Sequence, residues 1–155
     1  MKALVIYESV HHGNTKRIAE AMSAVLKAKL ERVGAAKASS LKGCGLVGFG
    51  SGIFFGRHHR TLLDFAGKLP EERGKAAFIF STSGSAKAEE NSSHNALRKL
   101  LTAKGFKIVG EFSCPGYDTF GPFRLIGGLN KGRPDKNDLA DARKFAEGIK
   151  RKLNR

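Results

Sequence analysis

The sequence predicts an α/β fold, a three-layer α/β/α sandwich with helices on both faces of a five-stranded parallel sheet. Two observations support this. Short apolar segments alternate along the chain with longer segments whose apolar residues recur at helical spacing. Each connection between neighbouring parallel strands needs a crossover, usually a helix, so a regular alternation of this kind favours a parallel sheet.

Five segments are predicted as strands. The first and fourth, Ala3–Tyr7 and Ala76–Ser81, are nearly continuous apolar runs, as expected for strands buried on both faces. The remaining three are shorter or weaker in pattern: Ala36–Ser39, Leu46–Gly50 and Lys107–Ser113.

Helices are predicted between and after these strands. The first is expected to end at Gly34, and the last to follow a turn begun at Pro134. The predicted helices are Asn14–Leu30, Arg60–Lys68, Ser92–Lys104 and Asp138–Leu153.

Length and composition predict one domain over residues 1–155. A chain of 155 residues that is 41% hydrophobic can build one core without disulfides or metal. Cys44 and Cys114 lack the spacing of a redox or metal motif, so reduced thiols in a cytosolic protein are expected. No segment reads as a signal peptide or as a transmembrane span, and a cytoplasmic location is predicted.

The junction between the first predicted strand and helix is suited to a phosphate. A strand that leads directly into a helix directs unpaired backbone N–H groups and the positive end of the helix dipole at one point. Ser9, Asn14 and Thr15 add side-chain donors there. Gly13 stands alone, so the junction lacks the spaced glycines of the Walker and dinucleotide motifs, and a monophosphate fits better. Taken alone, the same residues also suit an ordinary helix cap.

This junction resembles the phosphate loop of flavodoxins and flavodoxin-like FMN proteins. In those proteins Gly-Asn-Thr follows a Ser or Thr directly behind the first strand, as Gly13-Asn14-Thr15 follows Ser9 here. The loop is one residue longer than in most flavodoxins, and Val10-His11-His12 replaces the family's hydroxyl side chains. The resemblance implies the flavodoxin strand order 2-1-3-4-5, with FMN at the switch point between the first and third strands.

The resemblance also implies which residues hold the cofactor. FMN is the expected cofactor, and its phosphate is expected to contact the polar residues of the first loop. Those residues are Ser9, His11, His12, Gly13, Asn14 and Thr15.

The segment after the third strand is the candidate for binding the flavin ring. Small residues in Gly48–Gly56 allow close backbone approach, and the adjacent aromatics Phe54 and Phe55 offer a flat apolar face. A stacked aromatic is worth roughly 0.5–1.5 kcal/mol beyond area burial. The alternative is that both phenylalanines anchor the loop on the core. The predicted ring contacts are Ser51, Gly52, Ile53, Phe54 and Phe55.

The segment after the fourth strand, Ser81–Ser85, is the third part of the predicted site. The resemblance implies that Thr82, Ser83 and Gly84 surround the pyrimidine side of the ring with backbone donors. The second aromatic that often covers the outer face of the flavin is absent between Gly84 and Asn91. Tyr117, Phe120 or a partner subunit is expected to take its place.

The histidine pairs raise the question of a metal site. Imidazole pairs bind zinc, but no Cys or carboxylate completes a ligand set beside these residues, so no metal is predicted. His11 and His12 are expected to bond the phosphate instead, and His58 and His59 to lie on an exposed, arginine-flanked loop.

The charge of the chain departs from the family. It has 28 Lys and Arg against 14 Asp and Glu, a net charge of +14, whereas flavodoxins that carry electrons are typically acidic. The expected partner is therefore an acidic redox protein, with an anionic membrane surface as the alternative. The cations are spread over several helices without a recognition motif, so no specific nucleic-acid binding is predicted.

These features predict an FMN-binding, flavodoxin-like electron-transfer protein that needs no catalytic side chain. The alternative is an NAD(P)H-dependent, FMN-containing reductase of quinones or other small acceptors, so enzyme status stays open. The short chain favours the electron carrier. The missing second aromatic and the cationic surface favour the reductase. A third possibility is an interaction module of the same fold without flavin.

Overall fold

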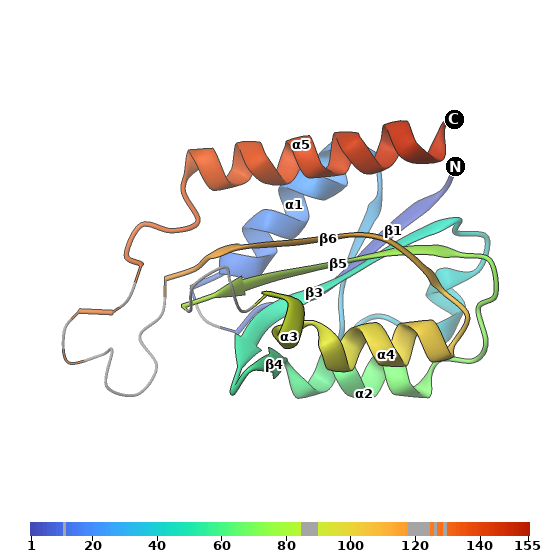
Figure 1. Ribbon diagram of the computed structural model, residues 1–155, viewed down its shortest axis with the longest axis horizontal. Coiled ribbons are helices and arrows are strands. Elements are labelled where there is room, and N and C mark those ends of the chain that lie inside the picture. The colour runs from blue at the N-terminus through green and yellow to red at the C-terminus, as the bar shows by residue number, and fades with distance from the viewer. Residues whose placement is uncertain (11, 85–89, 118–124, 126, 129) are drawn as a thin grey trace.

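The computed structural model describes residues 1–10, 12–84, 90–117, 125, 127–128 and 130–155. One sheet runs through the molecule, with helices on both of its faces (Figure 1). The strands are β1 (Ala3–Glu8), β2 (Lys29–Arg32), β3 (Leu46–Phe54), β4 (Arg57–His58), β5 (Ala76–Ser83) and β6 (Lys107–Pro115). The helices are α1 (Asn14–Leu26), η1 (Ala38–Leu41), α2 (Arg60–Lys68), α3 (Glu90–Ser93), α4 (Asn95–Ala103) and α5 (Lys136–Leu153).

The sheet topology confirms the predicted fold. The five long strands pair in parallel in the order β2-β1-β3-β5-β6, which is the expected 2-1-3-4-5 arrangement. The short β4 adds an antiparallel hairpin to β3, which the sequence analysis did not predict. β1 and β3 are neighbours, so the switch point lies between the carboxyl ends of these two strands.

Two cores hold the layers together. One lies between the sheet and the pair α1 and α5, and contains Val5, Phe78 and Phe80. The other lies between the sheet and the pair α2 and α4, and contains Ile6 and Ile79. Adjacent residues of one strand therefore enter different cores, which explains why β1 and β5 are continuously apolar in sequence.

The second predicted strand was wrong. The first helix ends at Leu26, not near Gly34, because Lys27 adopts a left-handed conformation with φ 52° and its N–H bonds the carbonyl of Ser23. The strand β2 follows at once, and the predicted segment 36–39 instead overlaps η1. β2 reads Lys-Leu-Glu-Arg and is an edge strand, so it lacks the apolar run by which strands were predicted.

Smaller differences concern the ends of elements. β3, β5 and β6 continue beyond their predicted ends, so Ser51–Phe54 and Thr82–Ser83 belong to strands and not to loops. The predicted helix Ser92–Lys104 is divided into α3 and α4 at His94. The final helix begins at Lys136, because Asp135 caps it by accepting hydrogen bonds from the backbone N–H groups of Asn137 and Asp138.

Candidate functional site

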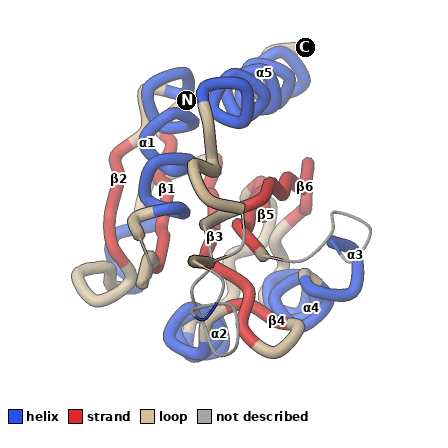
Figure 2. The backbone as a smooth tube through the Cα atoms, turned by 90° about the vertical axis from the view of Figure 1, so that its left-hand side faces the viewer, coloured by secondary structure: helices blue, strands red, loops and turns tan. Residues whose placement is uncertain are grey.

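The carboxyl ends of β1, β3 and β5 meet at one edge of the sheet, and the segment after β6 begins beside them. Figure 2 looks onto this edge, where the connection between β1 and α1 lies next to the ends of β3 and β5. The predicted site residues in the described part of the chain belong to these connections and strand ends. His11 and Phe120 lie outside the described residues.

The connection between β1 and α1 places amides at a helix N-terminus. His12 and Gly13 both have left-handed backbones, with φ of 56° and 66°, and Gly13 is the N-cap of α1. The hydroxyl of Ser9 accepts a hydrogen bond from the N–H of Lys16 (3.3 Å), which closes the loop over the first turn. The N–H groups of Asn14 and Thr15 at the helix start and the hydroxyl proton of Ser9 are donors of the kind that bind a phosphate monoester.

Asn14 and Thr15 are buried, and their side chains join this loop to two others. Asn14 Nδ2 donates to the carbonyl oxygen of Tyr117 (2.8 Å), and the hydroxyls of Thr15 and Thr82 lie 2.8 Å apart. Gly116 makes the first contact possible, because a Cβ there would lie 2.8 Å from Asn14 Nδ2. The Asn-Thr pair therefore holds the ends of β1, β5 and β6 together, a role that sequence reasoning did not assign to it.

The hairpin of β3 and β4 carries the residues predicted to contact the ring. Ser51 is buried, and its hydroxyl accepts a hydrogen bond from the N–H of His59 (2.9 Å) while donating to the carbonyl of Gly52 (2.7 Å). Gly52 and Ile53 are half-buried. Ser51 thus fixes the base of the hairpin.

The two phenylalanines of the hairpin have different environments. Phe54 is half-buried and packs edge-on against His59, with ring centroids 5.2 Å apart. Phe55 is 90% exposed and has a φ of 52°, a conformation that costs a residue with a Cβ about 1–2 kcal/mol. Neither ring belongs to the two buried cores, which counts against the alternative of two core anchors.

The end of β5 supplies the third part of the site. Thr82 is buried, whereas Ser83 and Gly84 are half-buried. Asn130 Nδ2 donates to the carbonyl of Gly84 (3.3 Å), and the N–H of Gly116 donates to the carbonyl of Ser83 (3.0 Å). The segments after β5 and β6 are thereby linked.

Tyr117 covers the first loop. Its ring lies 4.2 Å from that of His12 between centroids, and its hydroxyl donates to the carbonyl of Gly127 (3.0 Å). An aromatic ring therefore lies against His12 of the β1–α1 connection.

Comparison with known proteins agrees with this geometry. The flavodoxin domain model matches residues 4–121, which includes all the predicted cofactor-binding residues. The chain belongs to the flavodoxin domain family. An uncharacterized protein of Methanocaldococcus jannaschii is 43% identical over 149 residues, covering 96% of this chain and 98% of that protein.

Solved flavodoxins share the fold of this family member. Oxidised flavodoxin 2 from Bacillus cereus superposes with a TM-score of 0.72 at 18% identity, over 98% of this chain and 99% of that one. The Fusobacterium nucleatum flavodoxin, solved with flavin mononucleotide bound, has a TM-score of 0.68 at 14% identity over the same shares of the two chains. The family assignment supports FMN as the cofactor predicted from the first loop.

Sequence reasoning missed Glu8, the last residue of β1 in this flavodoxin-like chain. Its buried carboxylate accepts hydrogen bonds from Arg32 Nε (2.9 Å), the hydroxyl of Thr61 (3.0 Å) and the N–H of Ser9 (3.1 Å). Burial acts to raise the pKa of Glu8, but the hydrogen bonds from Arg32 and Thr61 outweigh it and lower the pKa below its usual value. The ionised carboxylate ties the first loop to β2 and α2.

The prediction that His58 and His59 lie on an exposed loop was wrong for His58. His58 is 1% exposed, because its ring points from β4 toward β5. There its Nε2 lies 3.2 Å from the carbonyl oxygen of Phe80. Burial, with a smaller contribution from the neighbouring His94, lowers the pKa of His58 to about 3. His59 is half-buried and caps α2, its Nδ1 accepting from the N–H of Thr61 (3.1 Å).

A polar network beneath β5 also went unpredicted. His94 is fully buried, with Nε2 2.7 Å from the hydroxyl of Ser81 and Nδ1 2.9 Å from a carboxylate oxygen of Glu111. Arg98 donates to both oxygens of Glu111, at 2.8 and 2.7 Å. These contacts connect Ser81, the residue of β5 that precedes Thr82, to β6 and α4.

Three further observations concern the cysteines, metal binding and membrane spans. Cys44 and Cys114 are thiols buried in different cores, on opposite faces of the sheet. Among the residues that the structure describes, no three His, Cys, Asp or Glu side chains are grouped so as to hold a metal ion. Within the same residues, no helix combines the length and apolar character needed to cross a bilayer.

Proposed function

We propose that this protein binds FMN at the switch-point edge and transfers electrons through it. The observation that carries the proposal is that the carboxyl ends of β1, β5 and β6 are bonded to one another: Asn14 and Thr15, after β1, bond directly to Tyr117, after β6, and to Thr82, in β5. Three separate strand ends are thereby held as one site, at the place where open α/β sheets bind ligands. FMN supplies the redox chemistry when bound, and the protein supplies binding and orientation.

The roles of the residues follow from their positions. The first-turn amides of α1 and the hydroxyl of Ser9 would hold the phosphate, beside the ring of His12. The exposed ring of Phe55 and the half-buried ring of Phe54 are the candidates for contact with the flavin ring. Backbone groups of Ser83, the last residue of the neighbouring β5, and of Gly84 after it would contact its polar edge.

The left-handed Gly13 provides a test of the phosphate site. Gly13→Ala places a Cβ on a backbone with φ 66°, so the loop must shift and its amides turn away from the phosphate. We expect FMN affinity to fall by roughly tenfold or more, the equivalent of about 1.4 kcal/mol, in a titration followed by flavin fluorescence. Gly34→Ala is the matched control, because Gly34 has no positive φ and a Cβ there meets nothing within 4 Å. Equal affinities for the two variants would contradict the proposed phosphate site.

An electron carrier and a reductase remain to be separated. The carrier is the function we propose, with an acidic redox protein as partner. The cationic surface, which would attract the phosphates of NADPH, is the observation that favours a quinone reductase instead. Visible absorption during stepwise reduction distinguishes the two: we expect two separate one-electron steps, and slow steady-state oxidation of NADPH with a quinone. Fast NADPH turnover with a single two-electron step would support the reductase, and the absence of bound flavin would refute both.

A further inference from the structure

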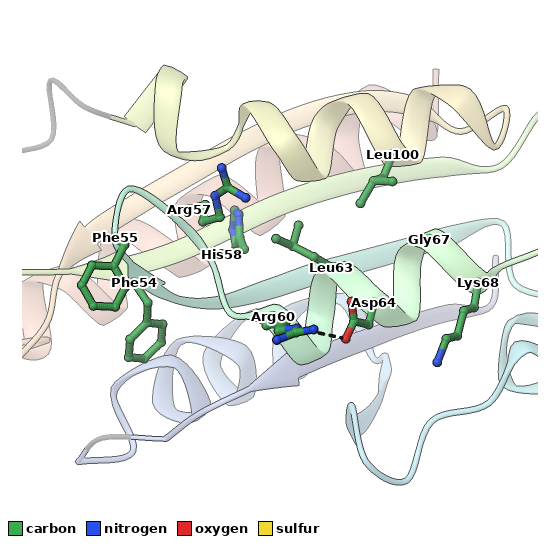
Figure 3. A pocket seen from close by; sticks show the side chains of 10 residues that line it. All are labelled: Phe54, Phe55, Arg57, His58, Arg60, Leu63, Asp64, Gly67, Lys68 and Leu100. Atoms are coloured by element: carbon green, nitrogen blue, oxygen red, sulfur yellow. Dashed lines mark ion pairs between the residues drawn. The ribbon is translucent and has the colours of Figure 1, made fainter.

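A groove on the outer face of the molecule shares only Phe54 and Phe55, at its hairpin end, with the proposed flavin site. It lies between α2 and α4, beside the β3–β4 hairpin, and has a volume of about 680 Å³. Leu63 of α2 and Leu100 of α4 both point into it, with Arg57 and His58 at the end nearest the hairpin (Figure 3). This volume falls within the range of roughly 300–1,000 Å³ that is usual for small-molecule sites.

The charge of the groove is positive. Its charged lining residues are Arg57, Arg60, Lys68 and Asp64, so a single acid accompanies three cations. Arg60 Nε lies 3.8 Å from the carboxylate of Asp64, which compensates one of the three. In the described part of the chain, Arg57 and Lys68 take part in no ion pair. His58 adds no charge near neutral pH, because burial lowers its pKa to about 3.

An exposed glycine of α2 lines the groove. Gly67 is in the last turn of α2, and a Cβ built on it would make its nearest contact at 3.8 Å, with Leu100 Cδ2. The position has ordinary helical geometry and would accept a larger residue, although glycine costs an exposed helix about 1 kcal/mol relative to alanine. The missing side chain leaves the apolar surfaces of Leu63 and Leu100 uncovered, and a flat apolar ring can lie against them.

We propose that this groove binds a small organic anion whose flat apolar body lies against Leu63 and Leu100 beside Gly67 and whose acidic group pairs with Arg57. The site goes beyond the proposed FMN function and does not require it. Phe54 and Phe55 line the hairpin end of the groove, so its occupant would lie close to the residues proposed to contact the flavin ring.

The test compares two fluorescent probes that share one ring system. The probe 1-anilinonaphthalene-8-sulfonate carries an anionic group, and N-phenyl-1-naphthylamine lacks it. With excess FMN present to fill the flavin site, we expect saturable one-to-one binding, with the anion preferred by roughly tenfold. Arg57→Gln is expected to abolish most of this preference and leave the affinity for the neutral probe unchanged. Gly67→Leu adds a side chain inside the groove and is expected to weaken the binding of both probes by about tenfold or more.

Two controls separate loss of the groove site from nonspecific charge effects and from misfolding. Lys150→Gln removes the same charge from the end of α5, on the opposite face of the sheet, and should leave both affinities unchanged (Figure 1). Thermal unfolding should show Gly67→Leu to be at least as stable as the parent protein. Unchanged binding in Gly67→Leu, or an equal effect of Lys150→Gln and Arg57→Gln on the preference, would overturn the site. FMN binding is measured separately by flavin absorption, so its failure with intact probe binding would refute only the proposed function.

Discussion

His58 is a titratable side chain enclosed by the fold. It is 1% exposed, and its ring lies 4.9 Å from that of His94 between centroids. Burial and this neighbour lower the pKa of His58 from 6.5 to about 3, so the folded protein holds it neutral where the unfolded chain would protonate it. The unfolded state therefore binds more protons in this interval, and the contribution of His58 to stability declines as the pH falls from 6.5 toward 3.

His58→Gln tests this assignment. Glutamine keeps a donor for the carbonyl of Phe80 but cannot be protonated, so the free energy of unfolding should fall less steeply between about pH 7 and about pH 4 than in the parent protein. Urea denaturation at a series of pH values measures the slope. His59→Asn is the control, because it removes an imidazole nearby and keeps a cap acceptor for α2. Parallel stability profiles for His58→Gln and the parent protein would refute the assignment.

The contact between β3 and β5 depends on two glycines. Gly48 and Gly50 of β3 pair in register with Phe78 and Phe80 of β5, and all four residues are buried. A Cβ on Gly50 would lie 2.2 Å from Cε2 of Phe80, and one on Gly48 would lie 2.2 Å from Cζ of Phe78. The missing side chains therefore make room for two large rings in the core beneath α1 and α5. The sequence analysis assigned these glycines to close approach of the cofactor, and the structure shows that they serve the core.

Gly50→Ala should destabilise the protein by about 1–3 kcal/mol, the usual cost of overpacking a core. Adding Phe80→Leu removes ring atoms that the new methyl group would meet, so the double variant should lose clearly less than the sum of the two single changes. Urea denaturation of the full cycle measures the coupling. Gly148→Ala in α5 is the control, because nothing lies within 4 Å of the added carbon. Strict additivity would show that the ring does not fill this space.

At the scale of the molecule, the net charge of +14 governs long-range encounters. A surface potential of one sign accelerates association with oppositely charged partners and is screened by salt, with a Debye length of about 10 Å at 0.1 M. The charge does not specify the fold, which this basic chain shares with the flavodoxins compared above. We therefore expect the net charge to favour oppositely charged partners.

Electron transfer from an acidic ferredoxin should show this steering. We expect the second-order rate constant to fall by roughly tenfold or more as NaCl rises from about 20 mM to about 300 mM, because the attraction is screened. Stopped-flow absorption of the flavin measures it. Reduction by an uncharged small-molecule reductant is the control and should change little. A rate that rises with salt would exclude an acidic partner.

The same charge should affect the flavin potential. Positive charge around the site stabilises the negative charge that FMN gains on reduction, so the potential should be less reducing than in acidic flavodoxins. A redox titration monitored by visible absorption tests this. A lower couple in the strongly reducing range usual for flavodoxins would contradict it.

Site features that depend on neighbouring residues could be predicted from the sequence, whereas those that depend on distant residues could not. The first loop was predictable because Ser9 and Gly13-Asn14-Thr15 are local in sequence and resemble a family motif. The side-chain bonds from Asn14 to Tyr117 and from Thr15 to Thr82 were not, because they join residues far apart in the chain. His94 and Glu111 were missed for the same reason, since neither has a local pattern that indicates its partner.

By itself, the sequence determined the layered fold and the strand order with its switch point, because apolar periodicity and the phosphate-loop resemblance are carried by neighbouring residues. Only the tertiary structure decided the place of β2, whose charged edge-strand sequence has no apolar run, and the burial of His58 under a hairpin that no sequence signal marked. It also decided how the ends of β1, β5 and β6 are joined and that a cationic groove opens between α2 and α4. Such features depend on which distant residues meet, and local sequence carries no record of those contacts.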